Sequence, residues 1–191
     1  MCWIPNLLTL SRLVLLLPVI LLLERGTPAA LWSALALFLA ASITDALDGW
    51  AARRLNCAGN IGIFLDPLAD KIFANVLLIY LASRHPDWIP LWAVLLLLAR
   101  EFAVQGFRSM APCLGVVIST GQMNKLKLVF QLTATGTTLA GLAWEDAAFL
   151  LRPLTWIVLG LALVTGIWSM LALFRENRDL WRRKPLTMER R

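Results

Sequence analysis

The sequence predicts an all-α integral membrane protein with six transmembrane helices. Of its 191 residues, 59% are hydrophobic and 16% are charged, whereas a typical soluble domain is about half apolar and about a quarter charged. The mean hydropathy is +0.72. Six apolar stretches are each close to the roughly 20 residues that a helix needs to cross a bilayer. We expect them at residues 5–23, 29–50, 66–83, 88–107, 122–144 and 153–174.

A soluble helical bundle is the structural alternative, and the sequence argues against it. Residues 128–144 and 154–174 contain no charged side chain, so a helix in either segment would have no polar face for water. Four prolines lie at or near the expected helix starts, where the missing N–H costs little: Pro28, Pro86, Pro90 and Pro153. We therefore expect one membrane domain, residues 1–174, followed by a basic cytoplasmic tail, residues 175–191.

The basic residues predict the orientation in the membrane. Only Arg25, Arg84 and Arg152 lie in the loops after the first, third and fifth apolar stretches, and the other fifteen Lys and Arg residues lie toward the opposite side. Because short cytoplasmic loops carry an excess of basic residues, both termini are predicted to be cytoplasmic. Three tryptophans would then lie in the outer aromatic belt: Trp88, Trp92 and Trp144.

The formal net charge of +6 favours anionic partners. For a membrane protein, lipid headgroups and phosphorylated substrates are the natural candidates. The sequence contains no recognition module that combines aromatic and basic residues, so nucleic acid is not an expected partner.

Four aspartates between residues 45 and 70 carry the chemistry. Asp45 and Asp48 are three residues apart and share one face of the second expected helix, and Asp66 and Asp70 are four apart and share one face of the third. The short link between the two helices predicts an antiparallel return, so that the two faces meet at the cytoplasmic edge of the bilayer. Four carboxylates this close together would repel one another unless cations neutralised them.

Oxygen ligands without His or Cys favour Mg²⁺ or Mn²⁺. Two such ions could bind a pyrophosphate and stabilise the attacking and leaving oxygens of a displacement. Gly49 and Gly62 would let a ligand approach the backbone closely, and Arg53 could bind phosphate oxygens.

The aspartates also have alternative interpretations. For Asp66 alone, the alternative is a simple N-cap. A divalent-cation transporter is the alternative from another class, but the Leu- and Ala-rich outer halves of the helices offer no polar path across the membrane.

Residues 45–70 match the pattern D-x2-D-G-x2-A-R-x8-G-x3-D-x3-D at every fixed position. This pattern is the signature of the CDP-alcohol phosphatidyltransferases, and the chain resembles that family. Further segments resemble its bacterial phosphatidylglycerophosphate-forming branch: residues 5–12, residues 100–102 with Arg108, and residues 125–127 with Gln131. The resemblance covers nearly the whole chain and is strong to about residue 131.

The resemblance implies a six-helix enzyme of the bacterial inner membrane, usually dimeric, with a cytoplasm-facing polar cavity that holds two divalent cations. It implies transfer of the phosphatidyl group from CDP-diacylglycerol to an alcohol, with release of CMP. The implied metal ligands are Asp45, Asp48, Asp66 and Asp70, and Asp70 is also the implied general base. The implied nucleotide- and pyrophosphate-binding residues are Gly49, Ala52, Arg53 and Gly62.

Basic residues outside the signature predict the acceptor alcohol. Arg100 lies in the cytoplasmic half of the fourth expected helix, Arg108 lies two turns further on, and Lys125 and Lys127 begin the fifth. Together they could bind a phosphate on the alcohol, which favours glycerol 3-phosphate. The alternatives are lysines that only anchor the chain at the membrane surface and an Arg100 that pairs with an acidic residue. A pair with Glu101 is not expected, because adjacent residues on a helix point in different directions.

Two positions depart from the Gly-Lys-x-Lys-Thr pattern of the resembled branch. Asn124 stands in place of the glycine and Leu128 in place of the threonine, which removes a hydroxyl that could contact phosphate. Other acceptors with the same chemistry therefore remain as alternatives. These are phosphatidylglycerol, which would give cardiolipin, and an inositol-type alcohol.

Overall fold

The computed structural model describes the backbone of residues 3–55, 60–114, 116 and 122–178, and the side chains of residues 13–44, 71–112, 116 and 123–178. Within these ranges all regular secondary structure is helical, which confirms the predicted all-α class. The six long helices are α1 (Trp3–Arg25), α2 (Pro28–Leu55), α3 (Asn60–Arg84), α4 (Leu91–Met110), α5 (Gln122–Ala143) and α6 (Ala148–Glu176). Two short 3₁₀ helices, η1 (Ala111–Leu114) and η2 (Glu145–Ala147), follow α4 and precede α6.

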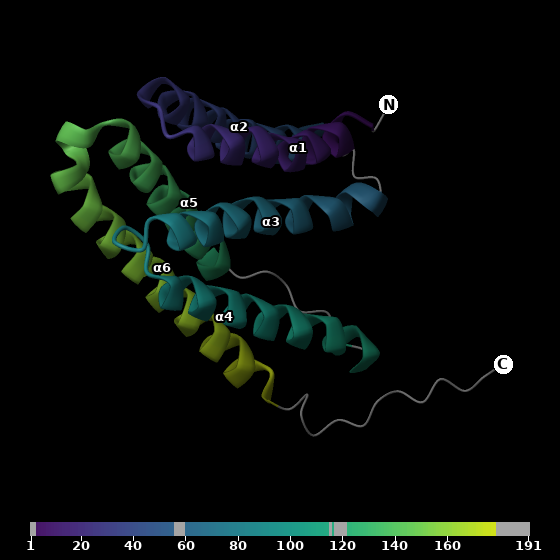
Figure 1. The fold of residues 1–191 in the computed structure, drawn as a ribbon. Helices are drawn as coiled ribbons and strands as arrows, with labels where there is room; N and C mark the ends of the chain where they lie inside the picture. The colour runs from purple at the N-terminus through teal and green to yellow at the C-terminus, as the bar shows by residue number, and fades with distance from the viewer. Residues whose placement is uncertain (1–2, 56–59, 115, 117–121, 179–191) are drawn as a thin grey trace.

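The six helices form a bundle in which the chain runs back and forth (Figure 1). Helices α1 and α2 lie side by side, α3 packs against α1, α4 and α5, and α6 packs against α4 and α5. The start of α1, the start of α3 and the far ends of α4 and α6 all lie at the same end of the bundle (Figure 1). This arrangement agrees with six expected stretches that alternate in direction.

The turn between α1 and α2 shows how local sequence sets this topology. Gly26 adopts a φ of 62°, a left-handed conformation that ends a helix and that glycine adopts without steric cost. The Thr27 hydroxyl accepts a hydrogen bond from the N–H of Ala30 at 3.3 Å, and Pro28 is the first residue of α2. The chain therefore reverses direction within two residues.

Next to this turn, Arg84 at the end of α3 donates a hydrogen bond to Glu24 at the end of α1 and so joins the two helix ends. This hydrogen bond lowers the pKa of Glu24 below its ordinary value.

Apolar side chains from all six helices form the core of the bundle. The rings of Phe38 in α2 and Phe73 in α3 stack with their centroids 6.0 Å apart. A Cβ added at Gly136 in α5 would lie 3.3 Å from the Phe38 ring, so a small residue at this position permits close packing of the two helices. The hydroxyl groups of Thr137 and Thr155 lie 2.8 Å apart and join α5 to α6.

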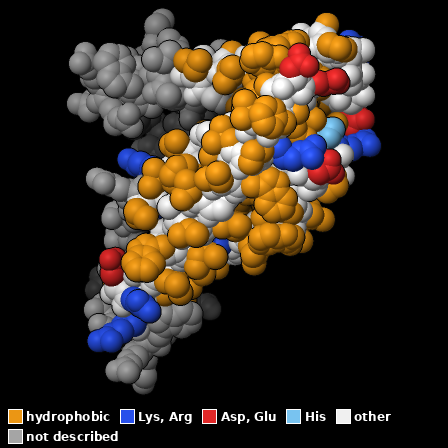
Figure 2. Space-filling model, turned by 90° about the vertical axis from the view of Figure 1, so that its left-hand side faces the viewer, with side chains coloured by type: hydrophobic (Ala, Val, Ile, Leu, Met, Phe, Trp, Pro, Cys, Tyr) orange, Lys and Arg blue, Asp and Glu red, His pale blue; other side chains and the backbone are white. Residues whose placement is uncertain are grey.

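Large apolar side chains also cover much of the outside of the bundle. Phe149 is 76% exposed, Phe102 is 72% exposed and Val164 is 65% exposed. Figure 2 shows one face on which apolar side chains fill the middle while charged side chains gather toward the two ends. By length and composition, the described segment Glu145–Glu176 could cross a membrane, and Pro28–Thr44 is a shorter apolar helix.

The structure corrects two of the local predictions. Pro153 lies inside α6 instead of at its start, because the helix already begins at Ala148.

Trp88 does not lie in an outer aromatic belt. It is 4% exposed, its ring lies against Gly141, and the Cζ atom of Arg152 lies 5.3 Å from the centroid of the ring. Trp92 and Trp144, by contrast, are more than half exposed, as that prediction requires.

Candidate active site

The signature residues lie at the end of one helix and at the start of the helix that follows it in the sequence. Asp45, Asp48, Gly49, Ala52 and Arg53 are in the last part of α2, and Gly62, Asp66 and Asp70 are in the first part of α3. Their side chains lie outside the described residues, so their roles as metal ligands, general base and nucleotide contacts stay predictions. Among the residues whose side chains are described, no group of three His, Cys, Asp or Glu residues could hold a metal ion.

A buried acidic residue next to this region gathers three basic side chains. The Oε2 atom of Glu101 in α4 accepts a hydrogen bond from Nζ of Lys127 in α5 at 2.6 Å. Its Oε1 atom lies 3.3 Å from Nζ of Lys71 in α3, and Nη1 of Arg100 lies 3.3 Å from Oε2. The cluster joins three helices: the buried Glu101–Lys127 pair links α4 to α5, and the partly exposed Lys71 links α4 to α3.

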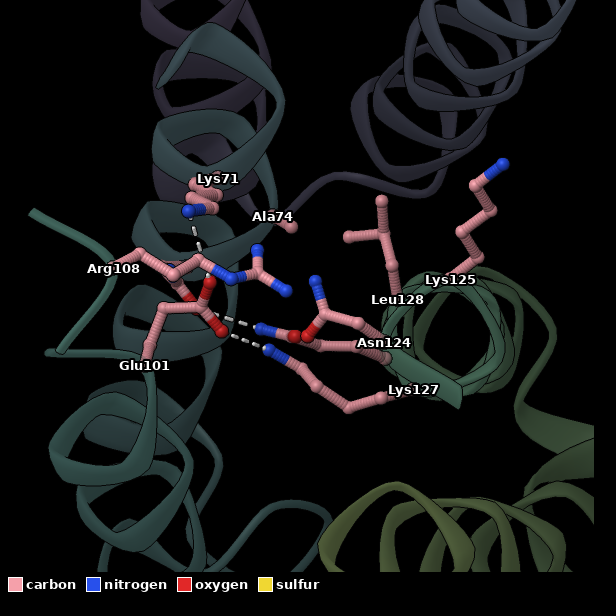
Figure 3. Close-up of a pocket in the computed structure, with 10 residues that line it drawn as sticks. Lys71, Ala74, Glu101, Arg108, Asn124, Lys125, Lys127 and Leu128 are labelled. Atoms are coloured by element: carbon pink, nitrogen blue, oxygen red, sulfur yellow. Dashed lines mark hydrogen bonds and ion pairs between the residues drawn. The ribbon is translucent and has the colours of Figure 1, made fainter. Parts of the chain in front are cut away.

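The Glu101 cluster forms one wall of a cavity of about 270 Å³ between α3, α4 and α5, which we call the basic cavity. Figure 3 shows the guanidinium of Arg108 pointing toward the centre of this cavity, and Lys125 pointing away from Glu101. The cavity is lined by four basic residues, one acidic residue, three amides and two apolar residues: Lys71, Arg108, Lys125, Lys127, Glu101, Asn75, Asn124, Gln131, Ala74 and Leu128. Its excess of positive charge suits an anionic ligand.

Arg100 differs from the other three predicted acceptor-binding residues, because it is not part of the lining of the basic cavity. Its guanidinium is 3% exposed and donates to the carbonyl of Gly166 at 2.9 Å, to Oδ1 of Asn124 at 2.7 Å and to the hydroxyl of Ser169. The expectation that Arg100 would not pair with Glu101 was wrong. Glutamate and arginine side chains are long enough to meet beside the helix even though their Cα–Cβ bonds diverge.

Two amide side chains complete the wall that α3 and α5 contribute to the basic cavity. Nε2 of Gln131 donates to Oδ1 of Asn75 at 2.7 Å, and both residues line the cavity. Sequence reasoning did not assign a role to Lys71, Asn75, Glu101 or Asn124. A signal was present in α5, where three polar residues follow one another at helical spacing and share one face: Asn124, Lys127 and Gln131.

Comparison with known proteins gives the family. Residues 2–168 match the CDP-alcohol phosphatidyltransferase family. The chain belongs to this family. It is therefore a phosphatidyltransferase-type enzyme, as the signature in α2 and α3 predicted, and the match includes every residue that lines the basic cavity.

Among the relatives of this phosphatidyltransferase are three bacterial proteins named CDP-diacylglycerol–glycerol-3-phosphate 3-phosphatidyltransferase. The protein from Bacillus subtilis (strain 168) is 33% identical, and the match covers 85% of this chain and 91% of the relative. The protein from Rickettsia bellii is also 33% identical, with 85% and 91% covered. The protein from Shigella flexneri is 31% identical, with 88% and 91% covered.

Proposed function

We propose that this enzyme transfers the phosphatidyl group from CDP-diacylglycerol to glycerol 3-phosphate, which releases CMP and forms phosphatidylglycerophosphate. The observation that carries the choice of acceptor is the basic cavity, because an uncharged alcohol would not need four basic side chains around it. The names of the relatives support the same acceptor.

The acceptor phosphate would bind to the basic side chains of the cavity. Arg108 offers a planar guanidinium that matches two phosphate oxygens, and its side chain points to the cavity centre (Figure 3). Lys125 also lines the cavity, and Lys127 is held at its edge by Glu101. Arg100 contributes indirectly, since its bonds to Gly166, Ser169 and Asn124 fix α4 and α5 against α6.

The position of the cavity relative to the signature supports this assignment. Ala74 and Lys71 line the cavity on α3. Residue 70 immediately precedes Lys71 and lies one helical turn before Ala74, on the same face of the helix. An acceptor in the basic cavity would therefore lie next to the predicted general base, Asp70.

The donor would bind beside the aspartates of α2 and α3. The carboxylate set fits divalent cations, because four oxygen donors at spacings of three and four residues lie at the end of α2 and the start of α3, and oxygen atoms are the ligands that Mg²⁺ and Mn²⁺ prefer. We propose that Asp45, Asp48, Asp66 and Asp70 hold two ions, Mg²⁺ or Mn²⁺, and that Gly49, Ala52, Arg53 and Gly62 receive the nucleotide and its pyrophosphate. When bound, the ions would neutralise the charge of the pyrophosphate.

The proposed reaction is a direct displacement at phosphorus. Asp70 accepts the proton of the acceptor hydroxyl as its oxygen forms a bond to the phosphorus that carries diacylglycerol. The bond between that phosphorus and the bridging oxygen of the pyrophosphate breaks, and CMP leaves with the electron pair. Trapping of a phosphatidyl–enzyme adduct would contradict this step.

We propose that the bundle, residues 1–174, is embedded in the bacterial inner membrane as a homodimer, with six spans and the cavity facing the cytoplasm. The exposed apolar side chains support this placement, because a water-soluble protein rarely exposes so much contiguous apolar surface (Figure 2). Both termini and the basic tail, residues 175–191, would be cytoplasmic. The orientation is tested with a reporter enzyme that is active only outside the cytoplasm, fused to one terminus at a time. Activity of the reporter at either terminus would contradict this orientation.

The proposal is tested by CMP release from CDP-diacylglycerol by the purified full chain with Mg²⁺ or Mn²⁺, with mass spectrometry of the lipid product. We expect release only when glycerol 3-phosphate is present, and phosphatidylglycerophosphate as product. Release that depended on phosphatidylglycerol or inositol instead would overturn the acceptor and leave the family chemistry intact.

A further inference from the structure

The amide of Gln131 has one polar atom that no described protein group satisfies. The residue is 1% exposed, and its Nε2 donates to Oδ1 of Asn75 at 2.7 Å. The other amide atom, Oε1, is buried and receives no hydrogen bond from the described part of the chain. Buried carbonyl oxygens are rarely left in this state, because the loss of hydration is then not compensated.

The position of Gln131 suggests what supplies the missing donor. The bond to Asn75 fixes the plane of the Gln131 amide, and both side chains line the basic cavity. The two neighbouring ammonium groups do not supply it, because Nζ of Lys127 donates to Glu101, Nζ of Lys71 donates to Gln105 at 2.8 Å, and neither forms a hydrogen bond with Oε1 of Gln131. The donor is therefore expected from a ligand in the cavity.

We propose that Oε1 of Gln131 accepts a hydrogen bond from a hydroxyl of the acceptor alcohol, and that Gln131 is a specificity-determining residue of the reaction. This inference rests on the proposed function. A phosphate oxygen and an amide oxygen are both acceptors, so the phosphate end of the ligand would lie at the basic side chains and its hydroxyl end at Gln131. Glycerol 3-phosphate carries both groups, and one hydroxyl remains when the other reacts.

The inference is tested with two acceptors that differ by a single hydroxyl. Glycerol 3-phosphate is compared with 3-hydroxypropyl phosphate, which keeps the phosphate and the terminal hydroxyl but lacks the middle one. For the unaltered enzyme we expect kcat/KM to be on the order of tenfold higher for glycerol 3-phosphate, as the loss of one hydrogen bond to a buried group predicts. The difference should lie mainly in KM.

In Gln131→Met, which keeps the side-chain length without the amide, the two acceptors should have nearly equal kcat/KM. This ratio does not depend on how much of the variant is folded, because both acceptors are measured on the same preparation. Gln131→Glu keeps an acceptor oxygen and should keep the preference. The matched control is Thr138→Val on the same helix, which removes a buried hydroxyl outside the cavity and should leave the ratio unchanged.

The outcomes separate this inference from the function on which it rests. If the enzyme releases CMP with glycerol 3-phosphate but shows no preference over the analogue, or if Gln131→Met keeps the full preference, the inference is overturned and the proposed function stands. If glycerol 3-phosphate causes no CMP release at all, both are overturned.

Discussion

Nζ of Lys127 lies 2.6 Å from Oε2 of Glu101, and both side chains are buried between α4 and α5. The same carboxylate also faces Lys71 and Arg100, so one negative charge holds three positive charges in place. This arrangement explains how a cavity can keep several basic side chains close together before an anionic ligand arrives. It also makes the basic cavity dependent on a residue that would not itself contact a phosphate.

The first prediction is that Glu101 and Lys127 are energetically coupled. Glu101→Gln should lower the free energy of unfolding by about 3 kcal/mol, because it leaves the buried charge of Lys127 without its partner. Lys127→Met should lower it by less, because Glu101 keeps its ion pairs with Lys71 and Arg100. The double variant should lose clearly less than the sum of the two single losses. Unfolding of the protein in detergent micelles measures the three values. Asp87→Asn is the control, because its pair with Arg152 is long at 3.8 Å and exposed, and the change leaves the contact between Arg152 and Trp88 in place; it should cost at most about 0.5 kcal/mol. Strictly additive losses would show that the cluster does not act as a unit.

The second prediction concerns Arg108. Arg108→Gln should raise KM for glycerol 3-phosphate by about 10- to 100-fold, since a hydrogen bond to a charged group contributes about 1.5–3 kcal/mol. KM for CDP-diacylglycerol should change little, because Arg108 lines the cavity assigned to the acceptor. Steady-state kinetics with each substrate varied in turn distinguishes the two effects. Equal increases in both KM values would place Arg108 elsewhere in the mechanism.

The third prediction concerns the aspartates. Asp70→Asn should lower kcat at least about 100-fold, which is the usual contribution of a general base. A chelator should abolish activity in the unaltered enzyme, and added Mg²⁺ or Mn²⁺ should restore it. Asp87→Asn, in the loop between α3 and α4, is the matched control and should keep full activity. Activity that survived complete removal of divalent cations would refute the proposed metal site.

The fourth prediction uses two glycines to test the packing of the bundle. A Cβ at Gly141 would overlap the ring of the buried Trp88, whereas a Cβ at Gly160 in α6 meets no atom within 4 Å. Gly141→Ala should therefore destabilise the protein by about 1–3 kcal/mol, as overpacking does. Gly160→Ala should be neutral or stabilise it by about 0.5–1 kcal/mol, because alanine favours a helix. Similar thermal unfolding temperatures for the two variants would contradict the buried position of Trp88.

The sequence by itself predicted the helical class, the approximate positions of six helices and the family. Long apolar runs leave few alternatives to a helix in a membrane, and the spacing of the signature residues is a local property of the chain. The turn at Gly26 to Pro28 is also local, because a left-handed glycine, a capping threonine and a proline act on their immediate neighbours.

Only the tertiary structure decided which basic residues face the same space. Arg100 and Arg108 are both basic residues of α4, yet Arg100 is held by α5 and α6 while Arg108 lines the basic cavity. Likewise, the sequence suggests that Trp88 is a surface anchor, but its ring packs against Gly141. Gln131 donates a hydrogen bond to Asn75, which lies 56 residues away in the sequence and on another helix. These contacts depend on how α3 to α6 are arranged around one another. That arrangement follows from packing over the whole bundle, which no short stretch of sequence specifies.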